Sequence, residues 1–259
     1  MIHRTAIIDK NSKISKNVIV GPFCVIGPNV EIGENTILHS NVNLTGNTKI
    51  GKSNEIFPFS SIGTPPQDLK YKGEKNSLII GDYNRFREYT NINPGTAQGG
   101  GLTKIGNNNL FMVYTHIAHD CLISNNVVLA NNVQVGGHVF IDNNAIIGGS
   151  CAIHQFSRIG QYAMIGGMTG VLSDVIPFSL SLGNRNTLAG LNLIGLRRAG
   201  IKNSDIKIIK KSYEMIFKTS NFRSNIENLP DEIKHNKYVI KILDFINKDK
   251  KRPIAQPIA

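Results

Sequence analysis

The fold is decided by residues 117–153, which read IAHDCLISNNVVLANNVQVGGHVFIDNNAIIGGSCAI. An aliphatic residue returns at every sixth position of this stretch, at Ile117, Ile123, Leu129, Val135, Ile141, Ile147 and Ile153. Neither an α-helix nor a simple alternating strand produces a period of six. Six-residue repeats are typical of a parallel β-helix, in which each repeat supplies one short strand and one corner. The stretch therefore predicts a solenoid of parallel strands.

The same period covers most of the chain, in three blocks. Its other aliphatic or Phe positions are Ile8, Ile14, Val20, Ile26, Ile32, Leu38, Leu44, Ile50, Ile56, Ile62, Ile80, Phe86, Ile92, Ile105, Phe111, Ile159, Ile165 and Val171. Glycine often follows the repeat position, as at Gly21 and Gly148. It suits a corner that needs unusual dihedral angles or a close approach of two backbones.

Two segments interrupt the repeat. Gly63–Leu78 is polar and contains two prolines, and Asn93–Lys104 contains three successive glycines. Insertions in a solenoid become external loops, and such loops often bind ligands. We therefore expect both segments to lie outside the coils.

Towards the C-terminus the hydrophobic spacing becomes helical. Ser204 is a suitable N-cap for a helix over Asp205–Lys218, and a second amphipathic stretch runs over Asp231–Asn247. The chain is therefore predicted to divide into a β-helix over residues 1–184 and an α-helical domain over residues 185–259. Such a domain would cap the open end of the solenoid.

The composition of the 259 residues narrows the class of protein. An apolar fraction of 41% suffices for a core, and no apolar run approaches the length of a membrane span. The repeat begins almost at Met1 and leaves no room for a signal peptide, so a cytoplasmic location is expected. Three cysteines are too few for a disulfide framework, and we expect Cys24, Cys121 and Cys151 to be inert core residues.

Positive charge is concentrated near the C-terminus. The net charge is +11, and residues 196–259 carry 15 Lys and Arg against 7 Asp and Glu. A basic region of this kind attracts nucleic acid, anionic lipid or an acidic protein. Because the chain has no Trp and no nucleic-acid-binding motif, an acidic protein is the favoured partner and no nucleic acid is expected.

Four of the seven histidines share one edge of the predicted prism, since residues 18 apart stack if three repeats close one coil. The four are His116, His119, His138 and His154. Gly137 follows His119 by 18 residues, and Asp120 precedes His138 by 18. A neutral histidine oriented by a polar neighbour is a usual general base near neutral pH, and a glycine amide nearby suits an oxyanion.

No Ser or Cys is singled out as a nucleophile in this cluster, which favours direct attack by a substrate hydroxyl. A histidine cluster can also hold zinc, as in the left-handed β-helix carbonic anhydrases, but those enzymes use a different ligand spacing. We therefore expect no metal. A purely structural β-helix is disfavoured, because it would not gather histidines at one edge.

Short motifs around these residues resemble one family closely. They are QDLKY at 67–71, QGGGLTK at 98–104, NL at 109–110, HIAHD at 116–120, LANN at 129–132, GH at 137–138, IGG at 147–149, HQF at 154–156, GLN at 190–192 and GLRR at 195–198. Together they are similar to the acyl-[acyl-carrier-protein]–UDP-N-acetylglucosamine O-acyltransferases, which start lipid A synthesis. The resemblance covers essentially the whole chain.

The resemblance implies a left-handed parallel β-helix and a homotrimer with active sites between subunits. It implies transfer of a 3-hydroxyacyl chain to the 3-hydroxyl of UDP-N-acetylglucosamine. The donor would be the phosphopantetheine thioester of acyl carrier protein, so no separate cofactor is implied. An acidic carrier protein also agrees with the basic C-terminal region.

In that reaction His119 corresponds to the general base, Asp120 to its supporting carboxylate and Gly137 to the oxyanion amide. The resemblance places at the substrates Gln67, Asp68, Lys70, His116, His138, His154, Asn192 and Arg198. Gly167, which stacks on Gly149, matches a position that sets acyl length, and glycine there implies room for a long chain.

The chain departs from the family pattern near the nucleotide. Ile194 replaces a Glu, Ala199 replaces a second Arg and Arg185 replaces a His. Asn93–Thr96 likewise replaces a common His-Arg-Gly-Thr, so phosphate contacts from that loop are expected to differ. The acyl length, and a 3-amino sugar as the acceptor, are left open.

The main alternative enzyme is a hexapeptide-repeat acetyltransferase that uses acetyl-CoA. The basic helical region and the Gln-Asp-Leu-Lys loop argue against it.

Overall fold

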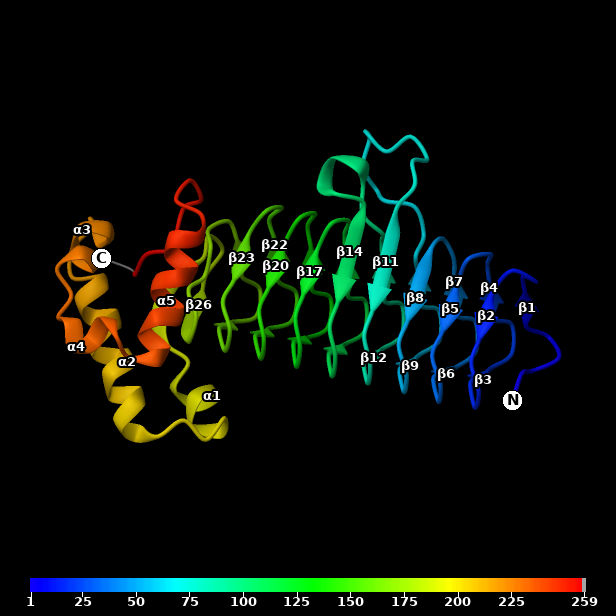
Figure 1. Ribbon diagram of the computed structural model, residues 1–259, viewed down its shortest axis with the longest axis horizontal. Helices are drawn as coiled ribbons and strands as arrows, with labels where there is room; N and C mark the ends of the chain where they lie inside the picture. The colour runs from blue at the N-terminus through cyan, green and yellow to red at the C-terminus, as the bar shows by residue number, and fades with distance from the viewer. Residues whose placement is uncertain (258–259) are drawn as a thin grey trace.

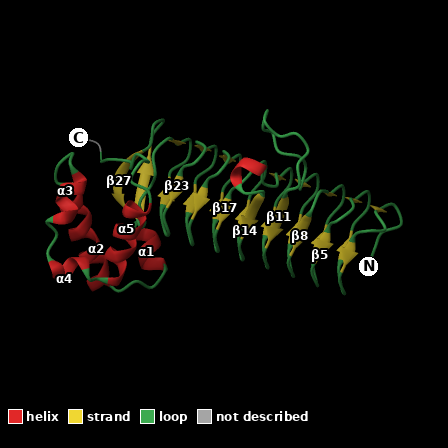
Figure 2. Ribbon diagram, turned by 45° about the horizontal axis from the view of Figure 1, so that its top comes forward, coloured by secondary structure: helices red, strands yellow, loops and turns green. Residues whose placement is uncertain are grey.

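The computed structural model describes residues 1–257. It is a long solenoid of short strands that ends in a group of helices (Figure 1). Figure 2 shows the strands repeating along the solenoid and the longer helices gathered at its C-terminal end. The predicted parallel β-helix with C-terminal helices is confirmed. Within residues 1–257, no helix has both the length and the apolar character needed to cross a membrane.

Three sheets form the sides of the prism, and they are parallel except for the last two strands of the third sheet, which pair antiparallel. The first sheet contains β1 Ile7–Ile8, β4 Val25–Ile26, β7 Asn43–Leu44, β10 Ser61–Ile62, β13 Asn91–Ile92, β16 His116–Ile117, β19 Gln134–Val135, β22 Ala152–Ile153 and β25 Gly170–Val171. The second contains β2 Lys13–Ile14, β5 Glu31–Ile32, β8 Thr48–Ile50, β11 Ser77–Ile80, β14 Leu102–Ile105, β17 Leu122–Ile123, β20 Phe140–Ile141 and β23 Arg158–Ile159. The third contains β3 Ile19–Val20, β6 Ile37–Leu38, β9 Glu55–Ile56, β12 Arg85–Phe86, β15 Leu110–Phe111, β18 Val128–Leu129, β21 Ile146–Ile147, β24 Met164–Ile165, β26 Ser179–Leu182 and β27 Thr187–Leu191.

Each coil takes one strand from each sheet, because pairing links every third strand. In the uninterrupted part His116 pairs with Gln134, and Gln134 with Ala152, so one coil is 18 residues. The first insertion lengthens a coil to 30 residues, from Ser61 to Asn91, and the second lengthens the next coil to 25, from Asn91 to His116. The predicted coil of three repeats is therefore confirmed.

Both insertions leave the solenoid as loops on one side (Figure 1). The first loop covers residues 63–76, and the second covers residues 93–101 and contains a short 3₁₀ helix at Ala97–Gly99. Each loop is shorter than the predicted insertion, because strands β11 and β14 take up its last residues and pair with each other.

The repeat positions fill the solenoid. From Val20 to Val171 each repeat side chain is at most 4% exposed, whereas Ile8 and Ile14 at the open end are partly buried. Phe86 and Phe111 stack in the middle of the core with ring centroids 5.1 Å apart. Burying one such side chain contributes about 1.5–3 kcal/mol, so these positions hold successive coils together.

Close approach, rather than an unusual dihedral angle, explains the corner glycines. A Cβ at Gly148 would lie 2.5 Å from the amide nitrogen of Gly167 on the next coil. The positive φ angles of the corners belong mostly to other residues, among them Asp120 at 59° and His138 at 60°. Asp, Asn and His tolerate this left-handed conformation better than most side chains.

The C-terminal domain contains five helices within the described residues, α1 Leu193–Arg198, α2 Asn203–Ile216, α3 Phe222–Glu227, α4 Asp231–Lys234 and α5 Lys237–Lys248. The predicted N-cap at Ser204 is wrong, because α2 begins at Asn203, two residues before the predicted start, and Lys202 occupies the N-cap position. The second predicted helix is divided, because the side chain of Asn236 caps a new helix by accepting from the Tyr238 amide at 2.9 Å. The domain boundary at residue 184 stays a prediction; strand β27, which follows it, still pairs with β26.

A buried carboxylate ties the helices to the last coil. Asp174 accepts from Arg158 Nε at 2.6 Å and from Arg252 Nε at 3.2 Å. Arg158 also donates from Nη1 to the carbonyl oxygen of Phe245 in α5 at 3.0 Å. Removing one partner of a buried pair costs about 3–5 kcal/mol, so this network holds the helical domain firmly against the solenoid.

Candidate active site

His119 and Asp120 form a hydrogen-bonded pair at the corner between the first and second sheets. His119 Nδ1 donates to Asp120 Oδ2 at 2.7 Å. The Asp120 side chain is 1% exposed and that of His119 is 13% exposed. Because an ionised carboxylate only accepts hydrogen bonds, the shared hydrogen lies on Nδ1 and Nε2 keeps a lone pair. An imidazole held in this tautomer can take a proton at Nε2.

The second loop holds the carboxylate of Asp120. The Thr96 amide donates to Oδ1 at 2.9 Å, and Thr96 Oγ1 donates to Oδ2 at 2.7 Å. The amide of Asp120 donates to Thr103 Oγ1 at 2.8 Å. Sequence reasoning gave neither threonine a role, although the interruption of the repeat marked this segment as a loop close to a ligand.

Gly137 lies one coil further along, directly over His119. A Cβ at Gly137 would be 2.6 Å from His119 Cε1 and 2.8 Å from Nε2, so the backbone itself packs against the ring edge that carries the lone pair. The N–H of Gly137 has no acceptor among residues 1–257. The predicted stacking is confirmed. A free amide beside Nε2 suits a negative charge that develops on a substrate oxygen.

His138 and Phe156 continue this corner on the following coils. The His138 ring lies edge-on to that of His119, with centroids 5.1 Å apart, and stacks on Phe156 at 4.4 Å. Burial lowers the pKa of His138 and is the largest effect, and the charge of His119 acts in the same direction. The negative charges of Asp120 and Asp68 oppose both. His138 is therefore neutral near pH 7.

His116 faces the same site from strand β16. Its Nδ1 donates to Asn91 Oδ1 at 2.7 Å, and Nδ2 of Asn91 donates to the carbonyl oxygen of Ser61 at 3.3 Å. Burial and then the charge of His119 lower the pKa of His116. His116 is thus neutral near pH 7, and its Nε2 is free to accept a hydrogen bond. The role of Asn91 had no signal in the sequence.

The first loop reaches this face of the solenoid. Gln67 and His116 share the wall of a cavity of about 320 Å³. The carboxylate of Asp68 acts on His138, since its charge raises the pKa of that histidine against the lowering by burial. The structure therefore brings Gln67 and Asp68 to the histidine cluster, as the resemblance implies.

Two other predicted residues lie at the margin of the cluster. Lys70 Nζ lies 3.5 Å from Gln98 Oε1, so it joins the first loop to the second. His154 is exposed, and its Nδ1 donates to the carbonyl oxygen of Gln155 at 3.0 Å. Neither side chain contacts the His119–Asp120 pair directly.

Asn192 and Arg198 lie on another side of the chain. Both line a mostly apolar groove of about 870 Å³ between helix α1 and the third sheet. Asn192 also caps α1, because its Oδ1 accepts from the Gly195 amide at 3.0 Å. Ile194 and Ala199, two of the departures from the family pattern, line the same groove. One chain alone does not bring this groove to the histidines.

Gly149 and Gly167 stack at the corner between the third and first sheets. A Cβ at Gly167 would lie 3.3 Å from the carbonyl oxygen of Gly149, and a Cβ at Gly149 would lie 3.3 Å from that of Asn131. The predicted stacking is confirmed. A larger side chain at either position would cover the backbone of the neighbouring coil.

Comparison with known proteins identifies the family. The family model described as bacterial transferase hexapeptide (six repeats) matches residues 2–46, and the one described as UDP N-acetylglucosamine O-acyltransferase, domain 2, matches residues 174–255. An acyl-[acyl-carrier-protein]–UDP-N-acetylglucosamine O-acyltransferase of Aliarcobacter butzleri is 46% identical over 197 residues, which are 76% of each chain. The chain belongs to this acyltransferase family.

Solved structures of acyltransferases in this family have the same fold as this chain. A crystal structure of a UDP-N-acetylglucosamine acyltransferase is 42% identical over the full length of both chains, with a TM-score of 0.96. LpxA from Acinetobacter baumannii is 43% identical, with a TM-score of 0.94 over 98% of this chain and 99% of its own. Superposition over the whole solenoid requires the same hand of winding, so the left-handed parallel β-helix is confirmed. The protein is an acyltransferase of this family.

The residue types of the histidine cluster could also form a metal site in this acyltransferase. His119, Asp120 and His138 offer ligand atoms within 4.8 Å of one another. Two ligands of a tetrahedral zinc ion are about 3.3 Å apart, whereas His119 Nδ1 and Asp120 Oδ2 are 2.7 Å apart, as in a direct hydrogen bond. Thr96 also donates to both oxygens of Asp120. The geometry suits an acid–base pair better than a ligand set, and the absence of a metal stays a prediction.

The nearest thiol is buried. Cys121 Sγ donates to the carbonyl oxygen of Gly136 at 3.1 Å, and burial raises the pKa of Cys121 to about 12. A thiol with this pKa is not a nucleophile at neutral pH. Cys24 and Cys151 are buried as well, which agrees with the expected core role.

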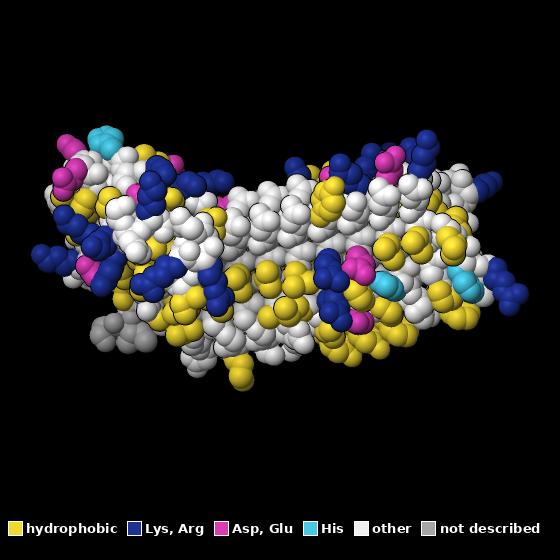
Figure 3. All heavy atoms as spheres, turned by 90° about the horizontal axis from the view of Figure 1, so that it is seen from below, with side chains coloured by type: hydrophobic (Ala, Val, Ile, Leu, Met, Phe, Trp, Pro, Cys, Tyr) yellow, Lys and Arg dark blue, Asp and Glu magenta, His cyan; other side chains and the backbone are white. Residues whose placement is uncertain are grey.

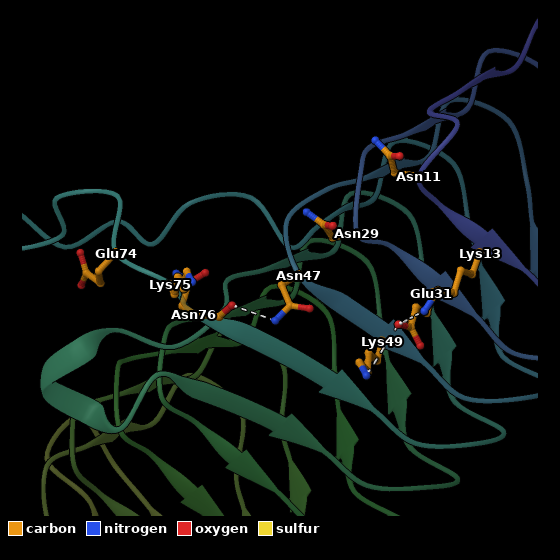
Figure 4. Close-up of a pocket in the computed structure, with 9 residues that line it drawn as sticks. All are labelled: Asn11, Lys13, Asn29, Glu31, Asn47, Lys49, Glu74, Lys75 and Asn76. Atoms are coloured by element: carbon orange, nitrogen blue, oxygen red, sulfur yellow. Dashed lines mark hydrogen bonds and ion pairs between the residues drawn. The ribbon is translucent and has the colours of Figure 1, made fainter.

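A second polar hollow, of about 460 Å³, lies in the N-terminal half of this acyltransferase (Figure 4). Its wall repeats along the second sheet, where Glu31 pairs with Lys13 at 3.1 Å and with Lys49 at 3.7 Å. These charges satisfy one another and are partly exposed, so they contribute little to stability. The hollow contains none of the residues that the sequence pointed to.

Proposed function

We propose that this protein transfers a 3-hydroxyacyl chain from acyl carrier protein to the 3-hydroxyl of UDP-N-acetylglucosamine, the first step of lipid A biosynthesis. The names of the relatives supply the donor and the acceptor. The observation that carries the mechanism is the His119–Asp120 pair lying against the free amide of Gly137. The donor brings its own activated thioester, so the reaction needs no cofactor.

In this mechanism His119 Nε2 takes the proton of the sugar hydroxyl as that oxygen attacks the thioester carbonyl. Asp120 holds Nδ1 and stabilises the imidazolium, and the Gly137 amide donates to the oxyanion of the tetrahedral intermediate. The intermediate then expels the phosphopantetheine thiolate, which receives the proton from His119. The products are an ester and a free thiol, and the enzyme returns unchanged. The buried Cys121 offers no nucleophile, which supports a reaction without a covalent enzyme intermediate.

The remaining site residues would bind the substrates. They are Gln67, Asp68, Lys70, His116, His138 and His154 around the sugar and acyl groups, and Asn192 and Arg198 at the nucleotide. The lowered pKa values of His116 and His138 favour neutral rings that exchange hydrogen bonds with hydroxyl and amide groups. Gly149 and Gly167 would leave room for a long acyl chain.

We also propose that the active form is a homotrimer. The groove with Asn192 and Arg198 lies on the third sheet, whereas His119 lies at the corner that joins the other two sheets. A second copy that places its third sheet opposite the histidines would complete one site between two subunits. Tyr89 and Tyr114 have exposed rings that stack with centroids 4.8 Å apart, and this apolar surface also favours burial of the edge that carries them against another subunit.

The helical end supports docking of acyl carrier protein. Lys and Arg side chains are spread over this end of the molecule in Figure 3. An acidic carrier would be attracted to this surface, which chiefly raises the rate of encounter. We expect the reaction, like its water-soluble substrates, to be cytoplasmic.

The decisive assay measures acyl transfer from 3-hydroxyacyl-acyl carrier protein to UDP-N-acetylglucosamine. His119→Ala is expected to reduce kcat at least about 100-fold, because general-base catalysis contributes about 10²–10⁴. His3→Ala, at an exposed histidine of the first coil, is the matched control. Full activity of His119→Ala would remove the proposed base. Turnover of acetyl-CoA in place of the acyl carrier protein substrate would favour a hexapeptide-repeat acetyltransferase instead.

A further inference from the structure

The carboxylate of Asp120 receives an unusual set of partners. In addition to His119, it accepts from the amide and the hydroxyl of Thr96, one at each oxygen. No Lys or Arg forms an ion pair with it among residues 1–257. The carboxylate is 1% exposed, so solvent does not screen its charge. Neutral donors thus hold the group in place without neutralising it.

The second loop is shaped around this carboxylate. A Cβ at Gly99 would collide with the Asp120 side chain, so only glycine fits at this turn of the 3₁₀ helix. The loop is fixed in turn by the first loop, where Glu74 Oε1 accepts from the Ala97 amide at 3.1 Å. The carbonyl oxygen of Thr96 accepts from the Gly99 amide at 3.0 Å. These bonds set the direction in which Thr96 donates.

We propose that Thr96 is a positioning residue for acyl transfer, which orients the Asp120 carboxylate so that it holds His119 in its reactive tautomer. This inference rests on the proposed function of His119 as the base. The two donors of Thr96 act on different oxygens of the carboxylate, so together they fix its orientation in a buried place. The full negative charge is then available to the imidazolium that forms during the reaction.

The two hydrogen bonds from Thr96 to Asp120 differ in how they can be tested. The amide bond to Oδ1 is part of the backbone and survives any substitution except proline. The hydroxyl bond to Oδ2 is made at the same oxygen that receives the His119 hydrogen, and this bond alone can be removed by mutation. Losing a hydrogen bond to a charged group at a buried site raises the reaction barrier and so lowers the rate about 10- to 100-fold.

The test compares Thr96→Val, which removes the hydroxyl at nearly the same volume, with Thr96→Ser, which keeps it. Thr96→Val is expected to lower kcat about 10- to 100-fold with KM changed less than about twofold, and Thr96→Ser to stay within about threefold of the wild type. Thr48→Val is the matched control, since Thr48 is also fully buried but donates only to a backbone oxygen, at 2.7 Å. If the Val variant does not fold, Thr96→Ala takes its place.

A second readout separates this inference from the proposed function. In histidine-labelled protein, the NMR signal of the His119 Nδ1–H is expected to shift or broaden in Thr96→Val and to stay in place in Thr96→Ser. Adding Thr96→Val to His119→Ala is expected to cause no further loss of activity, because both changes act on one unit. Independent losses in the double variant, or an unmoved NMR signal, would overturn the positioning role. Full activity of His119→Ala would instead overturn the proposed base, while the NMR signal still reports on Thr96.

Discussion

Replacing Gly137 with alanine is expected to lower kcat/KM about 100-fold. The added Cβ would lie 2.6 Å from His119 Cε1, whereas ordinary contact begins at 3.4 Å, so the ring must retreat by the difference, about 0.8 Å. A displacement of about 1 Å in a reacting group costs about 10²-fold, which equals about 2.7 kcal/mol of barrier.

The imidazole has no easy way to avoid this clash. Its Nδ1 is bound to Asp120 at 2.7 Å, and the His138 ring lies against it with centroids 5.1 Å apart. Moving the ring therefore stretches the hydrogen bond that sets its tautomer. The alanine keeps the backbone N–H, so the loss measures the position of the base rather than the removal of the oxyanion donor.

The assay is steady-state acyl transfer, with thermal unfolding measured on the same samples. Gly27→Ala is the matched control, because Gly27 occupies the same kind of corner near the N-terminus and a Cβ there would meet its nearest neighbour at 3.4 Å. Both variants are expected to fold, with melting temperatures close to that of the wild type. Activity of Gly137→Ala within about threefold of the wild type would show that the ring and the glycine do not form one reaction site.

Two further predictions concern pH and acyl length. The pKa values of His116 and His138 in the folded protein lie below the usual histidine value of about 6.5, so at lower pH the unfolded chain binds more protons and stability falls. The midpoint of urea unfolding should therefore decrease from about pH 7 to about pH 5, and it should decrease less steeply in the double variant His116→Gln/His138→Gln. An equally steep decrease in the double variant would show that other groups cause it. Gly167→Met should shift the preference towards shorter acyl donors by at least about tenfold, because each methylene kept out of an apolar site forfeits about 0.8 kcal/mol. Competition between long and short acyl carrier protein substrates, read by mass spectrometry, would contradict this if the product ratio did not change.

The structure also explains how a solenoid corner brings the proposed site residues together. Asp120 and His138 occupy the same left-handed corner position on successive coils, with φ angles of 59° and 60°. This conformation turns each side chain along the outer edge of the prism, so that groups 18 residues apart meet. The repeat thus aligns Asp120 with His138 on neighbouring coils.

Much of the fold and part of the site could be predicted because a solenoid converts sequence separation into distance. The stacking of Gly137 on His119 follows from one number, the length of a coil, and the buried side of each strand follows from the six-residue period. The helices were placed less accurately. Asn236, which caps α5, is one of several polar residues in this segment, so the sequence alone does not single it out as the cap.

The sequence by itself determined the coil, its hydrophobic interior and the histidine edge, since each depends on a period that neighbouring residues impose on one another. Only the tertiary structure decided how Thr96 and Asn91 complete that edge, and why Asn192 lies on a different side of the prism from His119. These contacts join segments whose separation is not a multiple of the 18-residue coil. These contacts depend on how the loops close and how the helices pack. The local sequence pattern does not predict the path by which a loop returns to the coil.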